Sequence, residues 1–185
     1  MFVPRFYASD GEFDCIHHRL KLYPCPHCHR IGSLILHGFL SGYDESVEGL
    51  RVRRGHRVFC SNRKRRKGCG RTFGILLAWL LNRSICGANT AWTYFRHVAA
   101  GMTKAKAMRE TRTAFSPSVP YNLWRQFSAH IVHLRTHLSR LAPPPDTDSD
   151  SPHTQTLRHL QTAFPYSATP IVQFQLHFQL PFFPA

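Results

Sequence analysis

The chain has 185 residues, 43% of them hydrophobic, so it can bury a core in one medium domain or two small ones. It carries 24 Lys and Arg against 10 Asp and Glu, which gives a formal net charge of +14. The excess is local, because residues 49–109 contain 15 basic residues and no acidic one. Such a charge favours phosphate backbones or anionic membrane surfaces over neutral small molecules.

The start of the chain and its apolar runs predict no membrane segment. Residues 1–22 are expected to form a lead-in without the charged start and apolar run of a signal peptide. The longest apolar run, residues 74–81, is far too short to span a membrane. Six cysteines without an export signal favour metal binding over disulfides. We therefore expect a cytoplasmic, nucleoid-associated protein with no membrane partner.

Residues 23–75 are expected to form a small β unit. Leu34–Leu40 has the composition of a strand, and a turn-rich acidic loop follows it. Arg51–Cys60 and Arg71–Ile75 are the second and third predicted strands. A three-stranded antiparallel sheet of this size buries too little apolar surface to fold alone. A metal is therefore expected to hold it together.

Residues 76–141 are expected to be helical, which makes the predicted fold class α+β. The first helix should span 89–100, with Asn89 as its N-cap. Gly101 ends it, and Thr103 can cap a second helix over 103–110. The three helices have the order of a helix-turn-helix, and Ser118 before Pro120 starts the third, which spans 118–141.

The end of the chain has a different composition. Residues 142–152 combine three consecutive prolines with the alternating acids that follow them, which is typical of a linker. In the tail, residues 153–185, a short helix is expected over 154–163. Ile171–Leu180 alternates apolar and polar residues, which predicts a one-sided strand.

Four cysteines have the spacing of one tetrahedral zinc site. Cys25 and Cys28 form a C-x2-C turn, which places two thiolates about one tetrahedral edge apart. Cys60 and Cys69 form a second pair that is stretched by six extra residues. Two alternatives stay open: a pair of cysteines buried without metal, or a histidine in place of Cys60, namely His27, His29 or His56.

These residues resemble a known family. Cys25-Pro-His-Cys28 with Gly32, and Arg57-Val-Phe-Cys60 ending in Gly68-Cys69-Gly70-Arg71-Thr72-Phe73, resemble the zinc ribbon of insertion-sequence transposases. The resemblance implies a zinc ribbon that precedes a helix-turn-helix, with both parts binding transposon-end DNA. The chain departs from the pattern in two ways. Eight residues separate the cysteines of its second pair, and no catalytic domain follows.

The second cysteine pair encloses five consecutive cations, Arg63–Lys67. Cations so close together repel one another unless a polyanion neutralises them, so phosphate contact is the natural use. A solvated loop or a localisation signal is the alternative. The predicted nucleic-acid contacts in this region are Arg51, Arg53, Arg54, Arg57, Arg63, Lys64, Arg65, Arg66, Lys67 and Arg71.

The third predicted helix supplies a second set of contacts. Asn122, Arg125 and Gln126 can make paired hydrogen bonds to base edges in a major groove. A packing helix with a polar outer face explains the same residues nearly as well. Two histidine groups have metal-like spacing but lack partners, so we interpret them as surface: His17 and His18 beside Cys15, and His130, His133 and His137. Trp92, Phe95, Trp124 and Phe127 are expected in the core, and Cys86 is expected to be a small core residue.

The acidic residues argue against catalysis. Carboxylate-type transposases need three acids around two metals, in a domain of their own. Here the acids fall at Asp10–Asp14, Asp44–Glu48, Glu110 and Asp146–Asp150, in the lead-in, turn and linker or alone. No phosphate-cradling glycine loop or nucleophile elbow is present. We therefore expect no enzymatic activity.

The sequence predicts a DNA-binding protein with a zinc-dependent fold, which resembles the recognition part of a transposase. It would act as a regulator, an accessory factor or a domesticated remnant. Double-stranded DNA is the expected partner, and a homo-oligomer or a transposase or transcription partner stays open. One alternative is a zinc-ribbon interaction module that docks on a transcription or RNA-associated complex. A ribosomal or RNA-binding ribbon is another.

Overall fold

The computed structural model describes the chain except residues 1, 47–49, 64–66, 83, 114, 147–149 and 185. It has the expected α+β composition, with four strands, six α-helices and a 3-10 turn among the described residues. The chain divides into two compact units. The first comprises Met1–Asp44 and Gly49–Ala78, and the second comprises Glu45–Glu48 and Trp79–Ala185. No helix of the described residues is long and apolar enough to cross a membrane.

The first unit is built on a sheet in the order β1-β4-β3-β2. Strands β2 (Leu34–Tyr43), β3 (Arg51–Cys60) and β4 (Thr72–Leu77) are antiparallel neighbours and correspond to the three predicted strands. The prediction of a purely antiparallel three-stranded sheet is wrong, however. A fourth strand, β1 (Phe6–Tyr7), pairs in parallel with β4 and makes the sheet mixed. Its two residues are aromatic and buried, and two residues are too few for a periodic signal.

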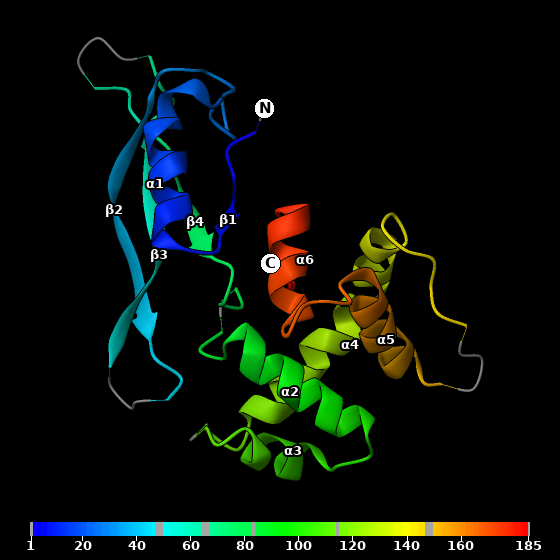
Figure 1. Ribbon diagram of the computed structural model, residues 1–185. Helices are drawn as coiled ribbons and strands as arrows, with labels where there is room; N and C mark the ends of the chain where they lie inside the picture. Colours follow the sequence, from blue (N-terminus) through cyan, green and yellow to red (C-terminus); the bar gives the residue numbers. More distant parts are fainter. Residues whose placement is uncertain are drawn as a thin grey trace. The chain divides into compact units, whose positions relative to one another are not determined.

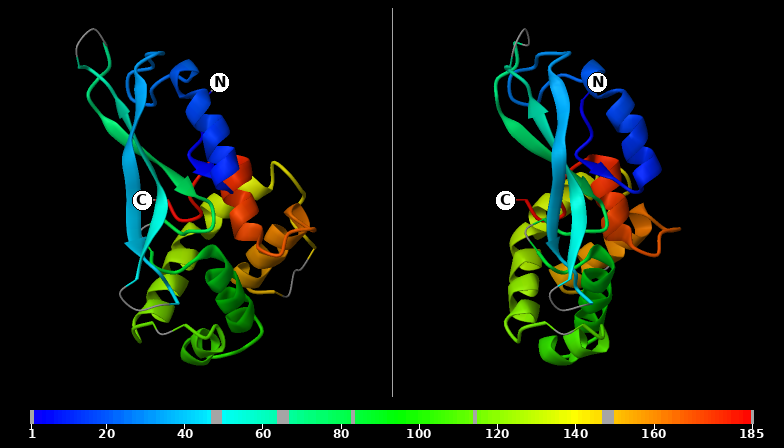
Figure 2. Two further views of the ribbon diagram at one scale, coloured as in Figure 1. Left: turned by 60° about the vertical axis from the view of Figure 1, so that its left-hand side comes forward. Right: turned by 90° about the vertical axis from the view of Figure 1, so that its left-hand side faces the viewer.

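Residues 1–22, expected as a lead-in, supply much of the first unit's core. Helix α1 (Asp10–His18) begins at Ser9, whose hydroxyl accepts from the Glu12 N–H, and η1 (Leu20–Leu22) follows it. Helix α1 lies on one face of the sheet (Figures 1 and 2). The buried cluster between this helix and the sheet combines side chains of residues 1–22 with side chains of β2, β3 and β4: Tyr7, Phe13, Ile16, Leu20, Leu34, Val58 and Ile75.

The hairpin of β2 and β3 is longer than the rest of the sheet. Strand β4 pairs only with residues Gly55–Phe59 of β3, so the part nearer the turn is a two-stranded ribbon. Gly55 lies at the boundary, where an added Cβ would come 2.3 Å from the Ile75 carbonyl oxygen. In Figure 1 the ribbon continues past the end of α1. A part of both strands therefore lacks cover from any helix of its own unit.

The second unit contains three helices close to their predicted positions: α2 (Ala88–Ala99), α3 (Lys104–Glu110) and α4 (Val119–Leu138). Thr103 caps α3 and Ser118 precedes α4, both as predicted. Helix α4 ends three residues earlier than the predicted 141. Phe95 of α2 stacks on Phe127 of α4, with ring centroids 4.5 Å apart, and both are fully buried.

The predicted N-cap of α2 is wrong. Gly87 occupies the cap position and Asn89 lies inside the helix, where its side chain accepts a hydrogen bond from Thr169. The capping acceptor is the Glu45 carboxylate, which binds the Gly87 N–H at 2.6 Å and the Thr90 hydroxyl at 2.9 Å. An acid at this end also complements the helix dipole. A partner 42 residues away in the sequence has no local signature.

The tail forms two helices, α5 (Pro152–Ala163) and α6 (Pro170–Phe178). The first agrees with the short helix expected near 154–163. The strand predicted over Ile171–Leu180 is wrong, because this segment is α6 followed by a left-handed residue at Gln179. Ile171, Phe174 and Gln175 are buried together, which is helical spacing. Pro170 in the first turn starts the helix, and tertiary packing overrides the alternating pattern.

His56 is the most unusual polar residue of the first unit's core. It is 4% exposed and stacks on Phe13, with the rings nearly parallel and their centroids 3.3 Å apart. Neither ring nitrogen has a hydrogen-bond partner among the described residues. Burial lowers the pKa of His56 and the Arg53 charge lowers it further, which outweighs the smaller effect of Asp10. The folded protein therefore holds this imidazole neutral.

This arrangement predicts a loss of stability in mild acid. The pKa of His56 is lower in the folded state than its ordinary value of 6.5, so below about pH 6.5 the unfolded chain binds more protons. The unfolding free energy of the first unit should fall as pH drops from 7.5 to 5. His56→Leu should make that fall shallower, and His18→Leu, at an exposed position of α1, should not. Hydrogen exchange of β3 and β4 amides at several pH values measures the unfolding free energy. Equal slopes of this free energy against pH in the two variants would contradict the prediction.

Candidate metal centre

The first cysteine pair lies in a tight turn between η1 and β2. The Cys25 N–H donates to the Arg30 carbonyl, and the His29 N–H donates to the Cys25 carbonyl, both at 2.9 Å. His29 adopts the left-handed conformation, with φ 58°, which reverses the chain directly after Cys28. The His27 N–H points at the Cys25 sulfur from 3.4 Å. This N–H···S contact stabilises negative charge on the thiolate.

The second pair forms a similar turn despite its longer spacing. Cys60 ends β3 and Cys69 precedes β4, and between them the Gly68 N–H donates to the Ser61 carbonyl at 2.9 Å. The Gly70 N–H donates to the Cys60 carbonyl at the same distance. An added Cβ at Gly68 would come 2.3 Å from the Ser61 oxygen, so the close approach requires glycine. Residues 62–67 are thus inserted between two residues that are already hydrogen-bonded.

The four sulfur atoms converge on one point. All lie within 4.8 Å of one another, with Cys25 3.8 Å from Cys69 and Cys28 3.7 Å from Cys60. A tetrahedral ion with metal–sulfur bonds of about 2.3 Å would have sulfur–sulfur edges of about 3.8 Å. The predicted quartet therefore fits one tetrahedral metal ion. No histidine belongs to the group in the described part of the chain, and His56 lies against Phe13 instead.

Hydrogen bonds make the four thiols unequal. Burial raises the pKa of Cys25 to about 12. At Cys60 burial acts in the same direction, but contacts with the Ser33 hydroxyl at 3.2 Å and the Cys69 N–H at 3.3 Å outweigh it. The pKa of Cys60 is thereby lowered to about 7. A bound cation would favour the thiolate at every position, and four sulfurs leave no open coordination site for a substrate.

The predicted basic residues that the structure describes lie near the second cysteine turn or on the hairpin that leads to it. Arg57 and Arg71 are exposed on β3 and just before β4. Arg63 lies over the Phe59 ring, with its guanidinium carbon 5.6 Å from the ring centroid. The Lys67 carbonyl accepts a hydrogen bond from Arg30 of the first turn. Lys64, Arg65 and Arg66 lie outside the described residues.

Arg51, Arg53 and Arg54 lie farther along the hairpin. Arg51 and Arg53 are exposed and share the α1 side of the ribbon, and Arg53 forms an ion pair with Asp10. The side chain of Arg54 lies against Gly42, where an added Cβ would come 2.3 Å from its Cδ. Arg30 and Ser33, which contact the second turn, were not predicted. Nothing in their spacing distinguishes them from ordinary surface residues.

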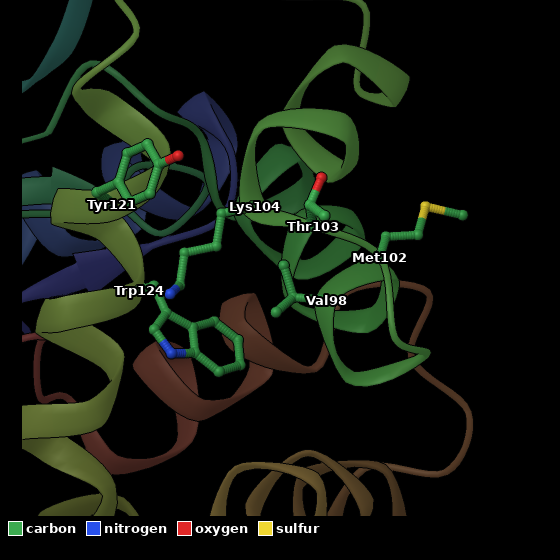
Figure 3. Close-up of a pocket in the computed structure, with 6 residues that line it drawn as sticks. All are labelled: Val98, Met102, Thr103, Lys104, Tyr121 and Trp124. Atoms are coloured by element: carbon green, nitrogen blue, oxygen red, sulfur yellow. The ribbon is translucent and has the colours of Figure 1, made fainter.

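The predicted base-contacting residues begin α4. Asn122 and Arg125 are exposed on adjacent turns, and Arg125 donates to the Asn122 side chain at 3.1 Å. Gln126 is half-buried. Beside them is an open pocket of about 360 Å³, lined by Val98, Met102, Thr103, Lys104, Tyr121 and Trp124 (Figure 3). Trp124, expected in the core, is only partly buried, whereas Trp92, Phe95 and Phe127 are core as predicted.

The remaining cysteines and histidines make no second metal group in the described chain. Cys15 is exposed, and Cys86 is buried as expected. His130, His133 and His137 were predicted on a solvent face, and this prediction is wrong. His137 contacts Phe178 and His130 contacts Phe183, with ring centroids 5.3 and 5.9 Å apart.

No family model, curated protein or solved structure matches this chain.

The quartet predicts one bound metal ion per chain. Cys25→Ser or Cys69→Ser should abolish stoichiometric metal binding and unfold the first unit. Structural thiolate sites supply about 10–16 kcal/mol, which is comparable to the whole stability of a domain. Cys15→Ser is the matched control, because this exposed thiol lies outside the group, and it should leave metal content unchanged. Elemental analysis and hydrogen exchange of β3 and β4 provide the measurement, and full metal content in Cys69→Ser would contradict the site.

Proposed function

We propose that the chain is a zinc-dependent DNA-binding protein that serves as a regulator, an accessory factor or a remnant of a transposase. The observation that carries the proposal is the position of the basic insert. Five consecutive cations, Arg63–Lys67, leave the second cysteine turn between Ser61 and Gly68. These two residues remain hydrogen-bonded at 2.9 Å. The insert is therefore unnecessary for closing the turn, and its composition needs another explanation.

The two ends of the insert are held against the folded unit. Arg63 lies over Phe59, and the Lys67 carbonyl accepts from Arg30. Arg57 and Arg71 add exposed cations from the adjacent strands. Because the ends of the insert are anchored, its cations are concentrated near Arg57 and Arg71, and their mutual repulsion destabilises the free protein. A bound phosphate backbone would relieve that repulsion. This charge pattern supports a polyanion as the partner.

Zinc is the metal that this ligand set favours. Four thiolates in tetrahedral arrangement suit zinc or an iron–sulfur centre, and the sulfur spacing fits a single ion. The ion would join the Cys25–Cys28 turn to the end of β3 and the start of β4. Its role in the proposal is structural, since it fixes the base of the insert.

The second unit supplies a sequence-reading element in this proposal. Helices α2, α3 and α4 follow one another in the order expected for a helix-turn-helix, and α4 would be the recognition helix. Asn122 and Arg125 are exposed at the beginning of α4, where such helices contact base edges. Contacts from the insert would give affinity, and contacts from α4 would give sequence preference.

A charge-preserving comparison tests the proposal. Replacing Arg63–Lys67 with five alanines should weaken duplex DNA binding and reduce the slope of log K against log salt. If all five cations contact phosphates, the slope should fall by about 4.5. Five lysines at the same positions should retain most of the binding, because they retain the charge. Fluorescence anisotropy at several salt concentrations gives both quantities. Salt-independent binding by the natural chain would instead favour the protein-docking alternative.

Removal of the insert should separate metal binding from DNA binding. Joining Ser61 directly to Gly68 converts the second pair into Cys-Ser-Gly-Cys, the spacing of the first pair. Because Ser61 and Gly68 already face each other, this deletion should retain one metal ion per chain. It should also lose duplex affinity to the same extent as the five-alanine variant. Loss of metal from the deletion variant would mean that the insert is structural.

A further inference from the structure

The two-stranded ribbon of β2 and β3 carries two exposed aromatic rings, each covered by an arginine. The Arg51 guanidinium carbon lies 5.7 Å from the Tyr43 ring centroid, and Arg53 lies at the same distance from Phe39. Tyr43 is 51% exposed and Phe39 is 61% exposed. The repeat of one arrangement along one ribbon is the observation from which the inference starts.

The strand register places all four side chains on one face. Tyr43 pairs directly with Arg51, and Ser41 pairs with Arg53, without a bulge between the two pairs. A register shift between Leu40 and Ser41 separates them from Phe39, but Arg53 still lies over the Phe39 ring, which places it on the same face. Phe39 pairs with His56, which faces α1, so this is the face that α1 covers farther along the sheet. Phe39 and Tyr43 are four residues apart, which is about 13 Å along a strand. They therefore form two separate stacking positions.

One of the two pairs is held in place by α1. Arg53 forms an ion pair with Asp10 at the beginning of the helix, while its guanidinium remains over Phe39. The contact orders the long arginine side chain before any ligand arrives, which lowers the entropy cost of binding. It also neutralises the nearest acid, Asp10. The two strands then keep a positive balance, since β3 also carries Arg51, Arg54 and Arg57 and neither strand contains an acid.

We propose that this face of the ribbon binds single-stranded nucleic acid by stacking unpaired bases on Phe39, Tyr43 and their arginines. Aromatic rings and guanidinium planes both stack on bases, and arginine also contacts the phosphates. Bases in a duplex are already stacked and offer only their edges. Exposed rings beside cations therefore match an unpaired strand better than a duplex. The inference rests on the proposed nucleic-acid function and adds the unpaired strand as the ligand of this face.

The test compares two ligands with ring-deleting and ring-keeping variants. The natural chain and its variants are titrated with a single-stranded 20-mer of thymidine and with a 20-base-pair duplex. Phe39→Ala with Tyr43→Ala should reduce single-strand affinity by about thirtyfold or more, since each of the two stacked bases contributes roughly 1–3 kcal/mol. Duplex affinity should change less than about twofold, because the arginines and the basic insert remain. Phe39→Tyr with Tyr43→Phe keeps both rings and should retain single-strand binding.

Two controls exclude a folding defect and a general surface effect. Metal content should be unchanged in the double alanine variant, and Tyr43→Ala alone avoids the packing contact between Phe39 and His56. Tyr166→Ala removes the most exposed aromatic residue of the second unit and should have no effect. Ultraviolet cross-linking to the thymidine strand should yield adducts at Phe39 or Tyr43.

The outcomes separate this inference from the function on which it rests. Duplex binding that depends on Arg63–Lys67, together with single-strand binding insensitive to the ring deletions, overturns the inference alone. Ring-dependent single-strand binding without a contribution from Arg63–Lys67 to duplex binding supports the inference and overturns the proposed duplex interface. A natural chain that binds neither ligand overturns both, and the exposed rings would then mark a protein-docking face.

Discussion

The convergence of four thiols is the constraint on which the first unit depends. The sheet has only four strands, one of them with just two residues, and its core draws on a single helix and the segments around it. Such a unit buries little apolar surface relative to the conformational entropy of ordering the chain. The cysteines link the turn before β2 to the end of β3 and the start of β4, so one ion would join two turns whose nearest cysteines are 32 positions apart in the sequence.

The position of the insert follows from that constraint. A loop of six residues added to a turn costs little if the ends of the turn are already held together, because closure entropy grows slowly with length. Here Ser61 and Gly68 are hydrogen-bonded and flanked by two metal-ligand candidates, Cys60 and Cys69. The turn can therefore carry a highly charged loop that would be unfavourable elsewhere in a small unit. The same reasoning explains why Gly68, with no space for a Cβ, stands where the loop rejoins.

The features that the sequence could predict are those whose determining residues lie close together in the chain. The two cysteine turns, the three antiparallel strands and the cap at Thr103 depend on residues a few positions apart, and local patterns indicated them. The parallel strand β1 and the Glu45 cap of α2 depend on partners far along the chain, so no pattern indicated them. Helix α6 shows a third case. Its alternation fits a strand, and only the packing of Ile171 and Phe174 in the second unit decides for a helix.

The candidate site divides in the same manner. A run of basic residues can be recognised from the sequence alone. The contacts of Arg51 with Tyr43 and of Arg53 with Phe39, in contrast, depend on the register of the hairpin. A shift of one residue would move these side chains to opposite faces. Strand β3 connects both proposed interfaces, with the ribbon residues at one end and Cys60 at the other. Its ten residues span about 33 Å. The basic insert depends directly on the thiol centre, whereas the ribbon depends on strand pairing and on Asp10. A single strand can thus present a duplex-binding loop and a stacking face whose supports differ, which is why variants can separate the two.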